Sequence, residues 1–188
     1  MGLPEHLEAF LGPIQGGWSR DADGHPLPFQ VVDFARGPRS HTVTFATLGL
    51  SKIPLRSRAT EKIIYHELII VLPESMRGGA APGILQQIGR DAIASGDALL
   101  RGDVVGPRGP MFGVGSQMEA FYAAIPVYFP DGFANYREED REVVMVWLVP
   151  ITGTEAAFVR THGWDRFEDE LVKADRDLTD LTRATLSS

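Results

Sequence analysis

Ser51 is the residue whose type and position come nearest to those of a catalytic nucleophile. It lies in the run TVTFATLGLSKIPL, residues 42–55, just after an expected strand and a glycine. A nucleophile elbow has the pattern G-x-S-x-G, because small neighbours let the serine sit on a strained turn that leads into a helix. Here the second glycine is replaced by Ile53, and Pro54 follows instead of a helix. The pattern therefore favours a structural serine whose hydroxyl bonds to the turn.

A histidine could still supply a base to Ser51, or several histidines could bind a metal ion. The chain has five histidines: His6, His25, His41, His66 and His162. None of them is spaced as H-x-x-x-H or H-x-H, so no metal site is predicted. His66 lies in the middle of an expected strand beside Glu67, and the two side chains point to opposite faces. A hydrolase that uses Ser51 with His66 or His162 is an alternative hypothesis, against which the missing elbow glycine counts.

A glycine-rich run, GPRGPMFGVGSQ at residues 106–117, contains a G-x-G pattern. Dinucleotide-binding loops need a third glycine at a fixed spacing, and phosphate-binding loops end in GKS or GKT. This run has neither feature, and prolines interrupt it. It is expected to be an irregular surface loop, and no cofactor is predicted.

The composition excludes several classes of function. Of the 188 residues, 44% are hydrophobic and 23% are charged, as in an ordinary globular protein. The formal net charge of −7 argues against nucleic-acid binding, which requires a basic surface. The absence of cysteine excludes disulfides, thiolate nucleophiles and cysteine-bound zinc, and it favours a cytoplasmic location. No membrane contact is expected, because the longest apolar runs, residues 122–129 and 143–151, are shorter than a span of ~18–20 residues.

Hydrophobic periodicity predicts an α+β domain. Strands are expected where apolar residues alternate or run continuously, and helices where they recur at spacings of three and four. The expected strands are residues 28–34, 43–48, 62–73, 118–129 and 141–151, and residues 99–105 are expected to form a short strand or a turn. The expected helices are residues 3–11, 82–95, 154–160 and a last helix from Trp164, with a loop over residues 12–28. Because strands cluster rather than alternating strictly with helices, we predict a single domain with a mixed or antiparallel β-sheet covered by helices.

The last expected helix has two different faces. Apolar residues recur on one face, at Trp164, Phe167, Leu171, Ala174, Leu178 and Leu181. This stripe is expected to pack on the body of the domain. Between residues 165 and 180 the chain has seven acids and three bases, so the other face is strongly acidic. Such a face is usually solvated surface, and contact with a basic partner is the alternative.

The run TFATLGLSKIPL, residues 44–55, resembles the strand-and-turn signature of the Suppressor of fused (SUFU-like) domain family. The resemblance continues in the same order through YHELIIVLP (65–73) and LLRGDVV (99–105). It closes with VWLVPITGTEAAFVRTHGWDRFEDEL (146–171), so it covers about residues 28–171. It implies three parts: an N-terminal helix and loop over residues 1–27, the SUFU-like domain over 28–171, and a C-terminal helical extension over 172–188.

The resemblance also suggests roles for individual residues. The candidate turn residues are Gly49, Ser51, Gly102 and Gly163. The resemblance makes Glu67 and Glu155 candidate partner-binding residues. The acidic face of the last helix, and not the resemblance, adds Asp169, Glu170, Asp177 and Asp180 to this set. For Glu67 and Glu155 a second role, as polar anchors inside the domain, stays open.

The family resemblance implies a protein-binding function without catalysis. Animal members hold a transcription factor in Hedgehog signalling, and bacterial members are proposed to act as immunity proteins against polymorphic toxins. This chain lacks the second domain of the animal proteins, so their signalling role is not carried over. We therefore expect a cytoplasmic, non-enzymatic domain that binds a protein partner, such as a cognate toxin, by occlusion. A hydrolase, or a scaffold without a toxin partner, is the alternative.

Overall fold

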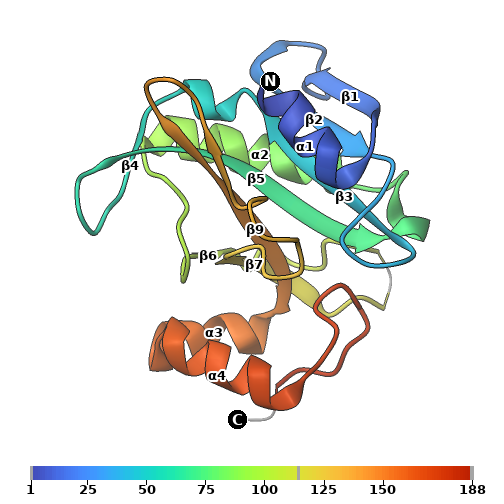
Figure 1. Cartoon of the computed structure of the whole chain (residues 1–188). Helices are drawn as coiled ribbons and strands as arrows, with labels where there is room; N and C mark the ends of the chain where they lie inside the picture. Colours follow the sequence, from blue (N-terminus) through green and yellow to red (C-terminus); the bar gives the residue numbers. More distant parts are fainter. Residues whose placement is uncertain (1, 114, 187–188) are drawn as a thin grey trace.

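The computed structural model describes residues 2–113 and 115–186, and its centre is a nine-stranded mixed sheet (Figure 1). The strands are β1 (Ile14–Arg20), β2 (Pro26–Phe34), β3 (Thr42–Leu48), β4 (Leu55–Arg56), β5 (Ile63–Pro73), β6 (Val104–Val105), β7 (Met118–Ala124), β8 (Asn135–Arg137) and β9 (Glu142–Thr152). Their order is β1-β2-β3-β5-β9-β7-β6, with β4 paired to β5 and β8 paired to β9. Only the β5–β9 pair among these is parallel. The predicted fold class, α+β with a mixed sheet, is confirmed.

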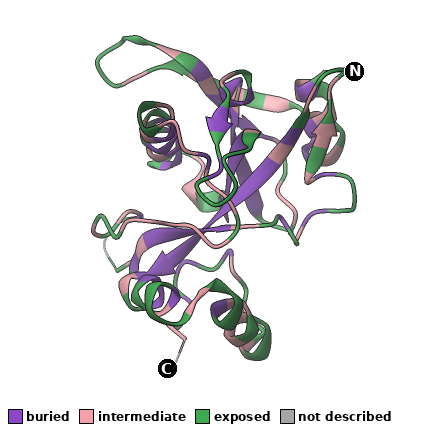
Figure 2. Ribbon diagram, turned by 90° about the vertical axis from the view of Figure 1, so that its left-hand side faces the viewer, coloured by how far each residue is buried: buried purple, intermediate pink, exposed green. Residues whose placement is uncertain are grey.

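Helices cover both faces of the sheet. They are α1 (Leu3–Leu11), α2 (Ala81–Ser95), α3 (Gly153–His162) and α4 (Trp164–Ala174). One core cluster joins α1, α3 and α4 to one face, and a second joins α2 to the other face. Figure 2 shows the result: the central strands are buried, while the helices turn an exposed side to solvent. No helix in the described part of the chain is long and apolar enough to cross a membrane.

The strands β5 and β9, of 11 residues each, lie side by side in the middle of the sheet. Both β5 and β9 are rich in apolar residues and buried on both faces over most of their length, as strands in the middle of a covered sheet should be. Pairing of β9 with β5 ends at Trp147, where pairing of β9 with β7 begins. The sheet therefore forks at Trp147 into two branches, one that continues through β5 and one that continues through β7. The apolar faces of each branch must be covered by other parts of the chain.

The C-terminal segment, residues 175–186, fills this fork. Leu181 packs in the core cluster on the α2 face, whereas Leu178 packs against the cluster on the opposite face. The side chain of Arg183 donates a hydrogen bond of 3.1 Å to the carbonyl of Pro150 in β9. The segment thus ties both branches of the sheet together.

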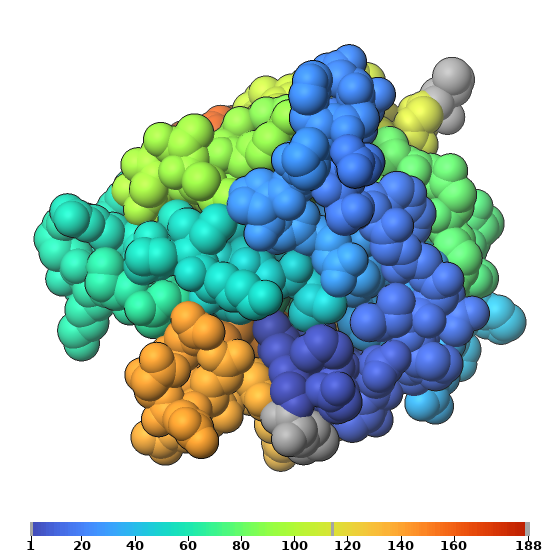
Figure 3. Space-filling model, turned by 90° about the horizontal axis from the view of Figure 1, so that it is seen from above, coloured from blue at the N-terminus to red at the C-terminus, as the bar shows by residue number. Residues whose placement is uncertain are grey.

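An excursion before β9 packs on the first helix. Figure 3 shows this loop and β8, in orange, against the N-terminal helix, in dark blue. The rings of Phe10 and Phe133 meet edge to face at 5.4 Å, and the rings of His6 and Tyr136 lie 5.1 Å apart. The charged run REED at residues 137–140 thereby lies at the tip of a supported hairpin.

Three expectations about secondary structure are corrected. Residues 12–28, expected as a loop, contain β1, which Gly16 and Gly17 disguise because glycine has low strand propensity. The strand expected over 118–129 ends at Ala124, since Pro126 cannot donate to a ladder. Of the helical extension expected over 172–188, the helix ends at Ala174, where Asp175 adopts the left-handed conformation, and residues 187–188 lie outside the described part of the chain.

Turns, not helix, follow Ala174 because of a short repeat, Asp-Leu-Thr-Asp-Leu-Thr, over residues 177–182. In each triplet the aspartate Oδ1 accepts hydrogen bonds from the backbone N–H and the hydroxyl of the threonine two residues later. These are Asx turns, which compete with helix formation. The leucines recur every three residues, and that spacing resembles a helical stripe in the sequence.

A candidate protein-binding groove

Glu67 lies at the centre of a buried network that includes Ser51. Its carboxylate accepts hydrogen bonds from the hydroxyls of Thr47 at 2.6 Å and Ser51 at 2.7 Å. It also accepts from the backbone N–H groups of Gly49 at 2.8 Å and Ser51 at 3.2 Å. Burial raises the pKa of Glu67, and these hydrogen bonds oppose the rise. Ser51 therefore anchors the turn after β3 to β5.

The alternative hydrolase is not assembled in this structure. The hydroxyl of Ser51 is buried and donates to Glu67. Nε2 of His66 instead accepts a hydrogen bond of 3.0 Å from the backbone N–H of Leu99, and burial lowers the pKa of His66 to about 4. No hydrogen bond joins Ser51 to His66 or His162 in the described residues. Ser51 therefore does not contact either of the histidines that the hydrolase alternative requires as its base.

Glu155 is the second buried carboxylate, and an arginine neutralises it. Arg183 contacts both oxygens, at 2.6 and 2.9 Å, and both side chains are almost completely buried. Glu155 also forms a capping box with Thr152 at the start of α3. Burial alone raises the pKa of Glu155, but the hydrogen bonds and charge of Arg183 outweigh it and hold the pKa below its ordinary value.

These positions change the expected partner-contact set. Because Glu67 and Glu155 are buried and bonded internally, neither offers a direct contact to a partner in this conformation. Asp177 and Asp180 hold the two Asx turns, so their Oδ1 atoms are committed to the fold.

The last two members of the set lie on α4. Glu170 pairs with Lys173 at 2.7 Å. Asp169 is exposed and forms no salt bridge within 4 Å in the part of the chain that the structure describes. Of the predicted partner-contact residues, Asp169 is the one that the fold leaves fully available.

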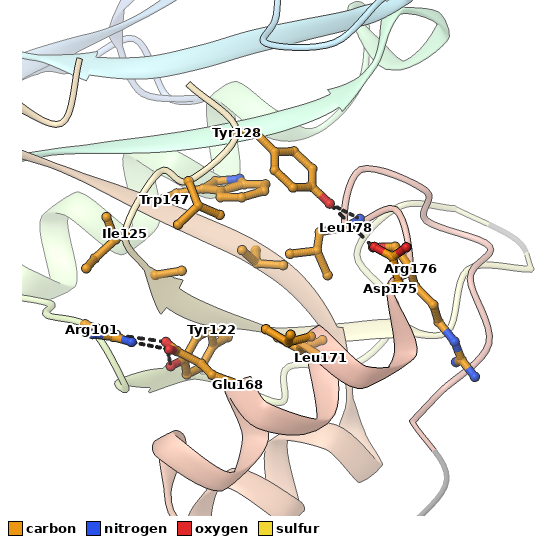
Figure 4. Close-up of a pocket in the computed structure, with 14 residues that line it drawn as sticks. Arg101, Tyr122, Ile125, Tyr128, Trp147, Glu168, Leu171, Asp175, Arg176 and Leu178 are labelled. Carbon is orange, nitrogen blue, oxygen red and sulfur yellow. Dashed lines mark hydrogen bonds and ion pairs between the residues drawn. The ribbon is translucent and has the colours of Figure 1, made fainter. Parts of the chain in front are cut away.

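An apolar groove lies between the sheet and α4, and the sequence did not reveal it. It encloses about 300 Å³. Figure 4 shows Trp147 and Tyr122 on the sheet side and Leu171 on the helix side. Ile125 and Val127, from the turn after β7, extend the lining. The groove draws on segments far apart in the sequence, so no single motif encodes it.

A fixed polar cluster closes one end of the groove. Arg101 makes two hydrogen bonds to Glu168, and the one from Nε is 3.0 Å long. The hydroxyl of Tyr122 donates to the same carboxylate at 2.6 Å. The guanidinium of Arg101 also lies 4.5 Å from the ring centre of Trp164. Arg101 lowers the pKa of Glu168, whereas burial raises the pKa of Tyr122.

Gly102 lets this cluster pack closely. Of the expected turn residues, Gly49, Gly102 and Gly163 all have positive φ, at 101°, 97° and 90°. At Gly102 an added Cβ would also lie 2.7 Å from the ring of Trp164. Glycine is therefore required there both for its backbone conformation and for the approach of the indole.

The other end of the groove is tied to the C-terminal segment. The hydroxyl of Tyr128 accepts a hydrogen bond of 3.1 Å from the backbone N–H of Leu178. The guanidinium of Arg39 lies 4.1 Å from the ring centre of Tyr128 and pairs with Asp177 at 3.5 Å. Both ends of the groove are thus held by several contacts.

Exposed apolar side chains gather at this groove. Among the residues that the structure describes, the large hydrophobic ones with substantial exposure are Ile63, Ile125, Val127, Trp164 and Val172. Three of them, Ile125, Val127 and Val172, line the groove, and Trp164 stacks on the arginine at its end. Clustered exposed apolar residues mark interaction sites, whereas single ones are common on any surface.

Comparison with known proteins identifies the fold. Residues 25–184 match the sequence profile described as Suppressor of fused protein (SUFU). The chain belongs to the SUFU family. The match extends beyond the predicted end of the domain at 171 and includes Arg183. The C-terminal segment that fills the fork is therefore part of the SUFU match.

Solved structures of SUFU proteins share this architecture. A SUFU homologue from Neisseria gonorrhoeae superposes with a TM-score of 0.76 at 22% identity, over 98% of this chain and 94% of that one. The structure of the Sufu–Fu complex gives 0.62 at 14% identity, over 85% and 75% of the two chains. Drosophila Suppressor of Fused gives 0.61 at 16% identity, over 85% of this chain and 42% of that chain. No curated protein sequence matches the chain.

Proposed function

We propose that this SUFU-family protein is a non-enzymatic, cytoplasmic domain that binds a protein partner and acts by covering it. Membership of the family carries the proposal. The structure of one relative is that of a complex, Sufu with Fu, so a related fold does bind another protein. The commitment of the Ser51 hydroxyl to Glu67 further supports a role without catalysis.

The partner that we favour is a toxin, which the protein would neutralise as an immunity protein. The bacterial homologue with a similar fold over nearly its whole length supports comparison with single-domain bacterial members. The net charge of −7 suits a toxin with a basic active-site surface, such as a nuclease, because opposite fields accelerate encounter. Neutralisation would then follow from stoichiometric occlusion of the toxin.

The test is co-expression of the protein with the toxin domain encoded beside its gene. We expect a stable one-to-one complex, loss of toxicity, and no covalent change in the toxin by mass spectrometry. Protection at far less than one equivalent, or a chemically modified toxin, would show that the protein is an enzyme instead. A toxin that is neither bound nor inhibited would favour the scaffold alternative.

A further inference from the structure

We propose that the groove between β7, β9 and α4 binds a peptide segment of the partner that carries apolar side chains flanked by lysine or arginine. The inference rests on the proposed protein-binding function and adds the place and the chemistry of the contact. We favour an apolar and basic segment because the groove has an apolar lining, exposed apolar side chains at its mouth and an excess of acids around it.

The apolar part of the proposal follows from the side chains at the mouth of the groove. Val127 and Val172 are 68% and 79% exposed, and both line the cavity. Leaving such side chains in water is unfavourable, so a partner that covers them gains affinity. The cavity volume of about 300 Å³ is at the small end of the ~300–1,000 Å³ of ligand pockets. It suits a few inserted side chains.

The groove is ready to bind because both ends are already fixed. At one end Glu168 accepts from both Arg101 and Tyr122, and at the other Tyr128 is bonded to Leu178. Binding therefore need not order these side chains, and that entropy cost is avoided.

The basic part of the proposal follows from the charges around the groove. Residues 164–175 contain five acids and two bases. Glu168 is neutralised by Arg101, but Asp165, Asp169 and Asp175 form no salt bridge within 4 Å among the described residues. Asp175 itself lines the groove.

Arg101 and Arg176 both line the groove, but the positive charge of Arg176 does not neutralise the acids at its mouth. The guanidinium of Arg176 binds the carbonyls of Ala184 and Thr185, and Figure 4 shows it turned away from the groove. A partner segment with cationic residues beside its apolar ones would meet a complementary field.

A second copy of the chain is a poorer occupant. Two copies would each bring a net charge of −7 to the contact. The one locally basic stretch, residues 49–62, is partly neutralised, since Arg58 pairs with Asp103 at 2.7 Å and Arg56 with Glu61 at 3.8 Å. It therefore offers little cationic surface to a neighbouring acidic groove.

The experiment is a selection of random 12-residue peptides displayed on phage, using the intact protein as bait. We expect enriched peptides to combine apolar residues with lysine or arginine, and to bind more weakly as salt is raised. Their affinities are measured by fluorescence anisotropy. Val172→Asp and Val127→Asp should each weaken binding about tenfold or more, because the new carboxylate must lose water in an apolar groove.

Ile63→Asp is the matched control. Ile63 is also an exposed apolar residue, at 49%, but it lies outside the groove, so this variant should bind the peptides like the wild type. Thermal unfolding checks that the variants fold, which the high exposure of Val172 leads us to expect. Peptides that bind Val172→Asp as tightly as the wild type would overturn the proposal, as would acidic peptides or no enrichment above that obtained with Val172→Asp.

Two further measurements separate this inference from the proposed function. A toxin complex that forms equally well with Val172→Asp would refute the groove but leave the protein-binding function intact. A dimer of the wild type that Val172→Asp dissociates in gel filtration would assign the groove to a second copy and overturn the proposal. Peptide binding without a toxin complex would support the groove and count against the toxin.

Discussion

Glu67 and Glu155 are both buried carboxylates, yet the fold satisfies them in opposite ways. Glu67 receives only neutral donors, from the turn at residues 47–51, and burial raises its pKa. Glu155 receives a cation, Arg183, and its pKa is lowered. The first network closes a local turn. The second ties the C-terminal segment to the start of α3, so its loss should affect the whole domain more.

The largest effect is expected from Arg183→Met. The substitution leaves the charge of Glu155 buried without a partner, which costs about 3–5 kcal/mol of unfolding free energy in comparable cases. Urea unfolding measures the loss. Arg176→Met is the matched control, because among the described residues that guanidinium donates to the carbonyls of Ala184 and Thr185 near the surface, and it should cost about 1 kcal/mol or less.

A double variant sharpens the same comparison. Glu155→Gln combined with Arg183→Met removes both charges and should recover much of the stability lost by Arg183→Met alone. Equal losses for Arg183→Met and Arg176→Met would contradict the special role of the buried pair.

The next effect is expected from Glu67→Ala. The substitution removes the acceptor of four buried donor contacts, and at about 1–3 kcal/mol for an unsatisfied buried group we expect a loss of roughly 3 kcal/mol. Glu67→Gln should lose less, because its carbonyl oxygen still accepts. Urea unfolding of the three proteins gives the order, and an alanine variant more stable than the glutamine variant would contradict it.

A smaller effect is expected from Ser51→Ala. One hydroxyl donor disappears while the backbone N–H of residue 51 still reaches Glu67, so the loss should be about 1 kcal/mol. Partner binding should be unchanged. If the wild type hydrolysed ester substrates and the alanine variant did not, the hydrolase alternative would replace the binding function.

The pH dependence is the subtlest contrast. Because the pKa of Glu155 is lowered from 4.5, its contribution to stability is present above pH 4.5 and is lost as the pH falls. The pKa of Glu67 is raised from 4.5, so its ionisation makes the folded state less favourable as the pH rises above 4.5.

Unfolding free energies measured from about pH 2 to pH 8 test these signs, as differences between the wild type and the Glu67→Gln and Glu155→Gln variants. Differences are needed because His66, with a pKa lowered from 6.5 to about 4, also destabilises the protein in acid. The two differences should change with pH in opposite directions. Parallel changes would show that the pKa values of Glu67 and Glu155 are shifted in the same direction, which contradicts the contrast between them.

The sequence predicted the fold better than the site. The apolar runs of β5 and β9 and the helical spacing of α2 are strong local signals, because burial on a sheet or a helix face imposes a short period. Gly49, Ser51 and Glu67 were singled out individually. Their contact with one another was not, since it depends on how β3 and β5 pair.

The groove and the C-terminal segment could not be predicted by the same means. The groove joins Arg101, Trp147 and Glu168, which only the folded sheet and α4 bring together. The three-residue spacing of Leu178 and Leu181 is also typical of a helix. Hydrophobic periodicity could not distinguish the two cases, because it takes no account of the side-chain hydrogen bonds that form the Asx turns.

The parallel pairing of β5 with β9 has a consequence for folding kinetics. Residues 65–69 pair with residues 143–147, so the middle of the sheet closes only after a long stretch of chain has been brought round. The entropy of closing such a loop slows folding, and contacts distant in sequence make a protein fold more slowly. The antiparallel strands β1, β2, β3 and β5 are neighbours in sequence and can assemble earlier. Until β9 arrives, β5 presents an apolar edge, and this is the stage at which a nascent chain would be most prone to aggregate.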